Sequence, residues 1–303
     1  MWSVAAHGSP SLPRNDEEHL QNGDMNTLPA SPTITLNDGV TIPQLGFGVW
    51  QVPATDAADA VGTALEVGYR HIDTAAAYGN EEGVGRAVLE SGLERDEVFV
   101  TTKLWNRDHG AASAKLALAA SLERLGLEHV DLYLIHWPVP SYDLYVETWE
   151  ALVELREQGL TRSIGVSNFE PAHLRRIIDA TGVTPSVDQI ELHPYFQQRE
   201  LTGELRRLGI DTESWSPLAQ GEAVRDPALV QIGEAHGKSA GQVALRWHIQ
   251  HGYIVFPKSV TPSRIRENFE IFDFALSADE MAAIDALDAG RRIGPDPDTF
   301  VLP

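Results

Sequence analysis

Residues 130–136 read Val-Asp-Leu-Tyr-Leu-Ile-His, a short apolar run that ends on a titratable side chain. A run of this length is typical of a buried β-strand. Seven comparable runs occur between residues 45 and 256, and most of them start about 25 to 32 residues apart, with a helical stretch in between. The strand candidates are Leu45–Gly48, Tyr69–Asp73, Val98–Lys103, Val130–Ile135, Arg162–Val166, Val187–Glu191, Asp211–Trp215 and Tyr253–Phe256.

Eight strands that alternate with helices favour an α/β fold of the (β/α)8 TIM-barrel type. A doubly wound open sheet has the same periodicity and is the structural alternative. Before the first strand, Thr33–Leu36 and Val40–Ile42 flank Asn37-Asp38-Gly39, which predicts a β-hairpin. The gap before the last strand is longer, so we expect extra helices near the C-terminus, over Pro227–His236 and Ala240–Gln250.

Several helix boundaries carry signals of their own. Asp56 is expected to cap a helix that ends at Gly68, because a carboxylate accepts free N–H groups and glycine tolerates the left-handed conformation. Pro171 suits the first turn of another helix. Ser239, with Gln242 three residues later, forms a capping-box pattern.

Residues 1–32 have no sustained period and are rich in Ser, Pro, Asn, Asp and Glu. This composition predicts a disordered N-terminal extension, followed by one barrel domain over residues 33–303. Met25 is an alternative start of the chain, and a genuine extension is equally compatible with the sequence. The first residues lack the basic start and apolar run of a secretory signal, so we expect a cytoplasmic protein.

The composition excludes several classes of function. The 303 residues include 23 basic and 44 acidic side chains, and the net charge of −21 opposes binding to nucleic acid or to an anionic membrane. The chain has no cysteine, which excludes disulfides, thiolate metal sites and a cysteine nucleophile. No apolar run approaches the roughly 20 residues of a membrane-spanning helix.

Familiar ligand-binding motifs are incomplete. The segment 233–239 has three residues between its glycines where a phosphate loop has four. Gly46-Phe-Gly48 lacks the third glycine of a dinucleotide fingerprint, and the segment 165–169 lacks the second glycine of a nucleophile elbow. His71 and Asp73 stand two apart, as some metal ligands do, but the pattern favours a core histidine and we expect no metal site.

Chemistry in a barrel lies at the C-terminal ends of the strands, and here those ends carry titratable residues. One strand ends at Asp73 and its loop contains Tyr78, while the next two strands end at Lys103 and His136. Tyrosine is a poor acid at neutral pH, and a neighbouring ammonium lowers its pKa. We therefore expect a proton-donating site. The alternative is a structural Asp73–Lys103 ion pair beside a buried tyrosine.

Four segments resemble signatures of the aldo-keto reductases: Gly-Tyr-Arg-His-Ile-Asp-Thr-Ala-Ala-Ala-Tyr-Gly-Asn-Glu at 68–81, and the segments 130–138, 162–169 and 256–260. The resemblance runs from about Thr33 to Pro303. It is strongest to the bacterial 2,5-diketo-D-gluconate reductases, which the segment 294–300 also resembles. Two positions depart from the family pattern. Asp188 stands where asparagine is expected, and Trp215 stands where many members have tyrosine or phenylalanine.

The resemblance implies an NADPH-dependent reduction of aldehydes, ketones or diketo sugar acids. Tyr78 would be the general acid, Lys103 and Asp73 would tune it, and His136 would position the carbonyl. The implied cofactor-binding residues are Ser167, Asn168 and Gln189 at the nicotinamide carboxamide, Trp215 on its ring, Ser216 and Leu218 along the pyrophosphate, and Lys258, Ser259, Val260, Arg264, Glu267 and Asn268 at the 2′-phosphate and adenosine.

Basic residues support the phosphate assignment independently. Lys258, Arg264 and Arg266 cluster after the last strand of an acidic chain, where barrels often bind phosphate. A solvated helix face is the alternative interpretation.

Large aromatic residues follow three of the strands: Trp50, Trp105 and Trp137. Each alone is compatible with simple packing, but three around one mouth predict the walls of an apolar pocket for a small-molecule carbonyl substrate. We expect the protein to act as a monomer.

Two other functions stay open at this point. A nucleotide-binding, redox-sensing subunit needs the cofactor site without the acid, and the complete set of four titratable residues argues against it. A Schiff-base lyase acting through Lys103 needs no nucleotide.

Overall fold

The computed structural model describes Met1 and residues 30–302, so the predicted extension of residues 1–32 and the alternative start at Met25 lie almost entirely outside the described residues. Ser31 and Pro32 are described, and both are held by the barrel. The Ser31 hydroxyl accepts a hydrogen bond from Leu45 N (2.9 Å), and Pro32 O accepts one from Gln44 N (2.8 Å).

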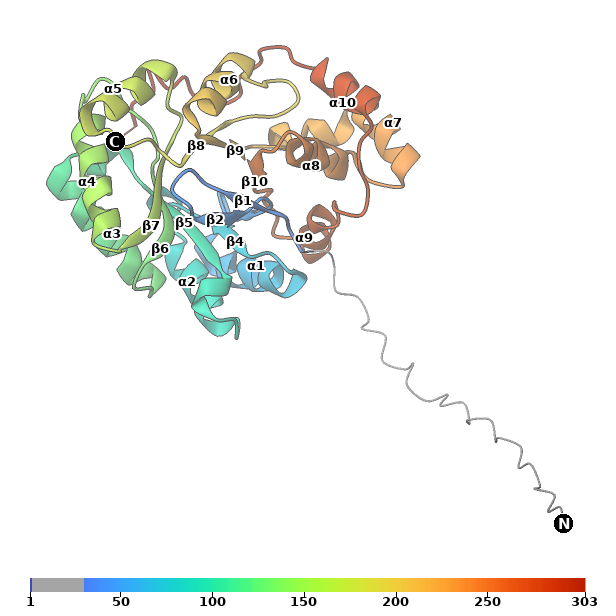
Figure 1. Ribbon diagram of the computed structural model, residues 1–303, viewed down its shortest axis with the longest axis horizontal. Helices are drawn as coiled ribbons and strands as arrows, with labels where there is room; N and C mark the ends of the chain where they lie inside the picture. The colour runs from blue at the N-terminus through green and yellow to red at the C-terminus, as the bar shows by residue number, and fades with distance from the viewer. Residues whose placement is uncertain (2–29, 303) are drawn as a thin grey trace.

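Eight parallel strands form a single sheet in chain order, from β3 to β10, and curl into a barrel with helices outside (Figure 1). The two end strands meet through a parallel bridge between Leu45 and Val255. Hydrogen bonds from Gly46 N to Val255 O (2.8 Å) and from Val255 N to Gln44 O (2.9 Å) close the ring. This closure confirms the TIM barrel and excludes the open sheet.

Three of the eight barrel strands coincide with their predicted bounds, and the other five differ by one or two residues at one or both ends. The hairpin ahead of the barrel is also confirmed, with Ile34 opposite Ile42. The strands are β1 Thr33–Thr35, β2 Thr41–Pro43, β3 Phe47–Gly48, β4 His71–Asp73, β5 Phe99–Leu104, β6 Val130–Ile135, β7 Thr161–Ser167, β8 Val187–Glu191, β9 Asp211–Trp215 and β10 Ile254–Val255.

Helices follow the strands and pack side by side around the barrel. They are α1 Ala54–Val67, α2 Glu81–Glu90, α3 Ala111–Leu125, α4 Tyr145–Glu157, α5 Pro171–Thr181, α6 Arg199–Leu208, α7 Pro227–His236, α8 Ala240–Gln250, α9 Pro262–Phe269 and α10 Ala278–Asp285. The predicted extra helices are α7 and α8, with the bounds expected from the sequence. A short 3-10 helix, Ala76–Tyr78, carries the tyrosine of the first signature.

Most of the helix-end predictions are confirmed. Gly68 ends α1 with φ 123°, and the Ser239–Gln242 capping box is formed at α8. The cap assigned to Asp56 is wrong, because α1 begins at Ala54 and Pro53 occupies the N-cap position. Asp56 lies in the first turn, where its negative charge still favours the positive end of the helix dipole.

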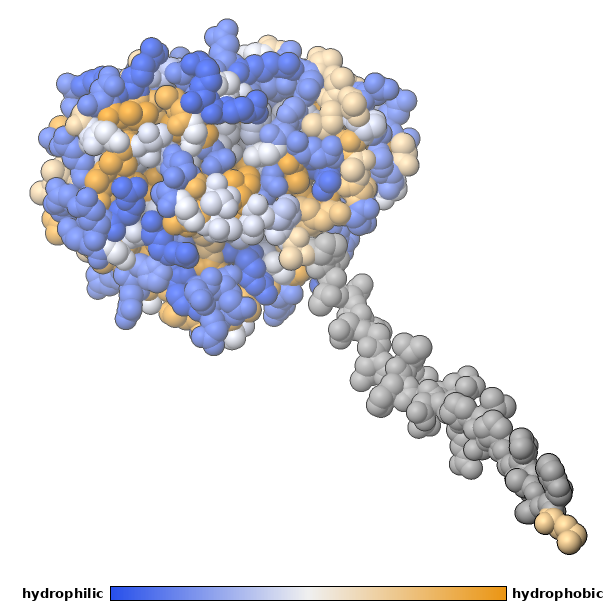
Figure 2. All heavy atoms as spheres, viewed as in Figure 1, coloured by the Kyte–Doolittle hydropathy of each residue, from blue (hydrophilic) through white to orange (hydrophobic). Residues whose placement is uncertain are grey.

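Apolar side chains fill the space between the sheet and the helices, and polar groups cover the outside. The face shown in Figure 2 is largely hydrophilic, as the net charge of −21 implies. None of the helices in the described part of the chain combines the length and the apolar character needed to span a bilayer.

Two glycines on neighbouring helices give a matched test of this packing. A Cβ at Gly85 on α2 would lie 1.9 Å from Leu125 O, whereas a Cβ at Gly62 on α1 meets nothing within 4 Å. We expect Gly85→Ala to lower the free energy of unfolding by ~1–3 kcal/mol through overpacking. Gly62→Ala should raise it by up to ~1 kcal/mol, because alanine is the better helix former. Urea unfolding measures both, and equal changes would contradict the packing of α2 against α3.

Candidate active site

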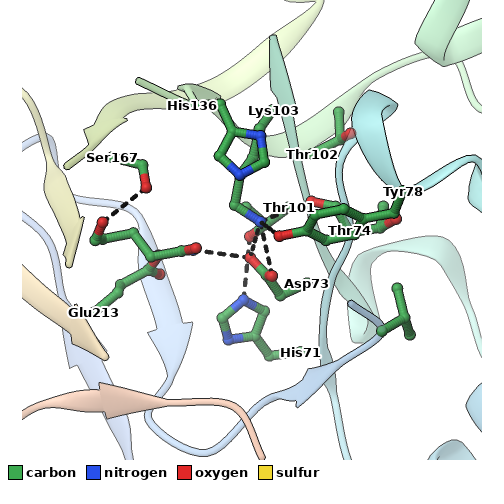
Figure 3. A network of polar contacts seen from close by, with 12 residues as sticks. His71, Asp73, Thr74, Tyr78, Thr101, Thr102, Lys103, His136, Ser167 and Glu213 are labelled. Carbon is green, nitrogen blue, oxygen red and sulfur yellow. Dashed lines mark hydrogen bonds and ion pairs between the residues drawn. The ribbon is translucent and has the colours of Figure 1, made fainter. Parts of the chain in front are cut away.

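A buried ion pair lies at the C-terminal end of the barrel. Lys103 on β5 is completely buried, and its Nζ donates to Asp73 Oδ1 (2.8 Å) and Oδ2 (2.9 Å) at the end of β4. The same nitrogen donates to Thr74 O (2.9 Å) and reaches the Tyr78 hydroxyl at 3.4 Å (Figure 3). The three hydrogens of the ammonium are therefore taken by the two Asp73 oxygens and by Thr74 O, and the phenol oxygen lies slightly farther away.

The environment of this pair sets the protonation of both groups. Burial alone would lower the pKa of Lys103, but the charge and hydrogen bonds of Asp73 oppose it, and Tyr78 and Glu213 add to this effect when they ionise, so the pKa is raised and the ammonium stays charged. Burial raises the pKa of Tyr78, and Lys103 lowers it by less. We expected the ammonium to lower this pKa overall. The net direction is upward, because burial of the phenol contributes more than the ammonium.

His136, directly after β6, lies beside the tyrosine. Its ring meets Tyr78 edge-on at 5.7 Å between ring centres and Trp105 at 5.2 Å. Burial, followed by the charge of Lys103, lowers the pKa of His136 well below its usual value, so the imidazole is neutral. Its Nδ1 is buried with no hydrogen-bond partner among the described residues. A neutral imidazole beside a protonated phenol provides hydrogen-bonding groups for one small polar atom.

The residues predicted at the nicotinamide carboxamide lie together at the ends of β7, β8 and β9. Ser167 Oγ donates to Gln189 O (2.7 Å), and Asn168 Nδ2 donates to Ser167 Oγ and to His136 O (3.0 Å each). Asn168 takes a left-handed conformation, φ 63°, and its Oδ1 accepts from Trp215 Nε1 (2.9 Å). The half-buried indole of Trp215 is thereby held in one orientation at the mouth.

The residues predicted at the pyrophosphate and adenosine follow β9 and β10. Ser216 and Leu218 are half-buried in the loop after β9, and Ser216 has φ 53°. Lys258 and Arg264 are exposed, and neither side chain forms an ion pair with a described residue. Of the remaining residues assigned there, Ser259 is buried, Val260 is exposed, and Glu267 and Asn268 on α9 are half-buried.

The predicted aromatic walls differ in exposure. Trp137 is buried against Phe300, with ring centres 4.4 Å apart, and Trp105 packs on His136. Trp50 is 46% exposed on the loop after β3. Phe300 comes from the C-terminal segment, so that segment helps to line this side of the mouth.

A buried carboxylate that the sequence did not single out anchors the C-terminal segment. Glu191 accepts from Ile293 N (2.6 Å), Gly294 N (2.7 Å) and His193 Nε2 (3.0 Å). Burial alone would raise the pKa of Glu191, but these hydrogen bonds outweigh it and the pKa is lowered. A Cβ at Gly294 would lie 2.4 Å from the Trp215 ring, so the anchored segment runs against the edge of the indole.

His71 and Asp188, both noted in the sequence, are buried inside the protein. His71 is a buried core histidine between Thr101 Oγ1 (3.1 Å) and Pro43 O (3.3 Å), and burial lowers its pKa to about 4. Within the described ranges, no cluster of three or more His, Asp or Glu side chains is arranged to hold a metal ion. Asp188 faces the backbone: Phe169 N lies 3.4 Å from its Oδ1, and burial raises its pKa well above the usual value.

Removing the buried ammonium should destabilise the protein. Lys103→Met leaves the Asp73 carboxylate buried without its counter-charge, which we expect to cost ~3–5 kcal/mol of unfolding free energy. The matched control is Lys115→Met, which breaks an exposed pair with Glu154 and should cost less than ~1 kcal/mol. Chemical denaturation measures both variants. Losses of similar size would mean that the buried pair is not the stronger structural element.

Comparisons with known proteins identify the family of the chain. The model of the aldo/keto reductase family matches residues 44–289. An aldo-keto reductase of Mycobacterium sp. (strain KMS) is 56% identical over 270 residues, which cover 89% of this chain and 98% of that protein. The methylglyoxal reductase DkgA of Escherichia coli (strain K12) is 54% identical over 274 residues, with 89% and 99% covered.

Solved structures extend the likeness to three dimensions. The crystal structure of an aldo/keto reductase from Brucella melitensis has a TM-score of 0.85 at 56% identity, covering 87% of this chain and 100% of that chain. A variant of Gox0644 in complex with NADPH has a TM-score of 0.87 at 48% identity, with 90% and 100% covered. With a matching family model, sequence and fold, the chain belongs to the aldo/keto reductase family.

Proposed function

We propose that this protein is an NADPH-dependent reductase that converts small-molecule aldehydes, ketones or diketo sugar acids to alcohols. The observation that carries the proposal is the Tyr78 hydroxyl placed 3.4 Å from a buried, charged Lys103. The relative DkgA is named a methylglyoxal reductase, and Gox0644 was solved with NADPH, which supports the same substrate class and cofactor.

The proton chemistry follows from the protonation states. The raised pKa of Tyr78 keeps its proton on the phenol at neutral pH, so the residue is loaded as a general acid. When Tyr78 gives this proton to a carbonyl oxygen, the Lys103 ammonium stabilises the tyrosinate that is left. Neutral His136 holds the carbonyl oxygen toward the phenol by a hydrogen bond. When bound, NADPH would supply the hydride for this reduction.

The chain offers groups that suit this cofactor. The exposed cations Lys258 and Arg264, which lack carboxylate partners within the described part of the chain, would pair with a 2′-phosphate. Trp215 presents a half-buried ring whose nitrogen is fixed by Asn168, and such a ring is suited to stack on a nicotinamide.

The two rival functions fit the site less well. A Schiff-base lyase needs an unprotonated amine, but the pKa of Lys103 is raised and the side chain is completely buried. A redox-sensing subunit has no use for a phenol held between an ammonium and an imidazole. We further propose that residues 33–303 act as one domain, in a monomer, in the cytoplasm, where reduced nucleotide favours the reductive direction.

The direct test is a panel of aldehydes, ketones and diketo sugar acids, followed by the loss of nicotinamide absorbance with purified protein. We expect NADPH-dependent turnover with at least one carbonyl class. Binding of NADPH without turnover of any member of the panel would favour the redox-sensing subunit instead.

Tyr78→Phe should abolish reduction and leave NADPH binding nearly unchanged, because only the phenol proton is lost and the ring still packs. We expect kcat to fall by about 10²–10⁴-fold, the usual contribution of a general acid. The control is Tyr253→Phe, which removes a hydroxyl just before β10, at the opposite end of the barrel. A Tyr78→Phe protein that keeps more than about a tenth of wild-type kcat would disprove the assignment.

Cofactor choice tests the cationic residues. NADH lacks the 2′-phosphate, and each charged contact contributes roughly 1.5–3 kcal/mol, so NADPH should bind at least about tenfold more tightly. The double variant Lys258→Met with Arg264→Ala should weaken NADPH much more than NADH, whereas Lys115→Met on the remote helix α3 should change neither. Quenching of tryptophan fluorescence gives the affinities. Equal affinities for the two nucleotides in the parent protein would remove these cations from the phosphate site.

A further inference from the structure

A second carboxyl group lies inside the barrel, next to the ion pair. Glu213 is in the middle of β9, paired with Gln189 on β8 and with Ile254 on β10, and its side chain is completely buried. In the view of Figure 3, Asp73 lies between Glu213 and Tyr78. The proposed proton transfer from Tyr78 does not involve this carboxyl group.

Gln189 links Glu213 to the ion pair. Its Nε2 donates to Glu213 Oε2 (3.0 Å) and to Asp73 Oδ2 (2.9 Å). An amide nitrogen has two hydrogens, so both are used. A flipped amide would set Oε1 against the Asp73 carboxylate, which is unfavourable. The two carboxyl groups therefore fix the orientation of Gln189 and leave its Oε1 as the free end.

The charges around Glu213 favour its neutral form. Asp73 on β4 and Asp211 on the same strand repel a carboxylate there, and Lys103 on β5 attracts one. His71, also on β4, has a pKa of about 4 and adds no charge at neutral pH. Burial, followed by repulsion from Asp73, raises the pKa of Glu213 to about 8. At neutral pH Glu213 is thus a neutral acid beside the Lys103–Asp73 ion pair.

We propose that Glu213 is a positioning residue. Through Gln189 it fixes the amide that faces the cofactor, and as a neutral acid it places no second negative charge beside Lys103 and Tyr78. This inference rests on the proposed function, in which Gln189 meets the nicotinamide carboxamide. Glu213 contacts neither substrate nor cofactor in this role. It acts only through the amide and through its own charge state.

Substitutions that separate shape from charge test the proposal. Glu213→Gln keeps the size and an oxygen acceptor for Gln189, whereas Glu213→Leu removes the acceptor. We expect Glu213→Leu to weaken NADPH binding about five- to tenfold, the loss of roughly one hydrogen bond's contribution to positioning. Glu213→Gln should bind NADPH as the wild type does at neutral pH. Ser214→Ala is the matched control, because it changes the next residue of β9 and the opposite face of the strand.

The pH dependence gives a readout that a merely structural role would not change. As the pH rises through about 8, Glu213 ionises. We expect its negative charge, added beside Asp73, to disfavour the tyrosinate and so to make the phenol a weaker acid. Wild-type kcat should therefore fall across this range, and Ser214→Ala should follow it. Glu213→Gln cannot ionise, so its kcat should hold to higher pH, and its melting temperature above that pH should equal or exceed the wild-type value.

Three results would overturn the inference: a pH profile of Glu213→Gln with the wild-type inflection, a folded Glu213→Leu that binds NADPH normally, or a Glu213→Gln protein as impaired as Glu213→Leu. If Glu213→Leu does not fold, the profile of Glu213→Gln decides. Fluorescence titration with NADPH separates a failure of the inference about Glu213 from a failure of the proposed function. A wild type that binds NADPH without turnover contradicts the reduction alone, and the affinities of the variants still test the role of Glu213.

Discussion

The ion pair between Lys103 and Asp73 is the interaction on which the rest of the site depends. A lysine ammonium with no solvent exposure is costly, and it is tolerated because Asp73 and Thr74 O satisfy it fully. Its charge then acts on everything nearby. It opposes the burial that raises the pKa of Tyr78, helps to keep His136 neutral, and limits the burial cost of Glu213. One buried cation thus acts on the pKa of three other residues, although burial contributes more at each of them.

The closed barrel makes this arrangement possible. Parallel strands bring their C-terminal ends to one mouth, so residues about 30 apart in the sequence become neighbours. Segments after the last strand complete the mouth. Glu191 anchors the backbone at Ile293, and Phe300 packs on Trp137. The aromatic wall at Trp137 therefore depends on a segment held by hydrogen bonds, whereas Asp73 and Lys103 lie on strands of the sheet.

Sequence reasoning predicts the barrel, because the number of apolar runs and their spacing do not depend on the exact boundaries of each strand. It also brings Asp73, Tyr78, Lys103 and His136 together, since the chain order of strand ends sets their neighbours. It fails where burial decides. The sign of the pKa shift of Tyr78 depends on how deep the phenol lies, which no local pattern reports. Glu213 was missed because one acidic residue in Asp-Thr-Glu-Ser-Trp looks like a solvated strand position, although its two-residue spacing from Trp215 indicated the inner face.

The central claim is that Tyr78 and His136 together hold the oxygen of a carbonyl substrate beside a bound nicotinamide. A crystal structure of the protein with NADP⁺ and an unreactive carboxylate analogue of the substrate tests it most directly. We expect one ligand oxygen within hydrogen-bond distance of both the Tyr78 hydroxyl and a ring nitrogen of His136, with the nicotinamide stacked on Trp215. A ligand oxygen bound elsewhere, with the Tyr78 hydroxyl contacting only Lys103, would contradict the claim.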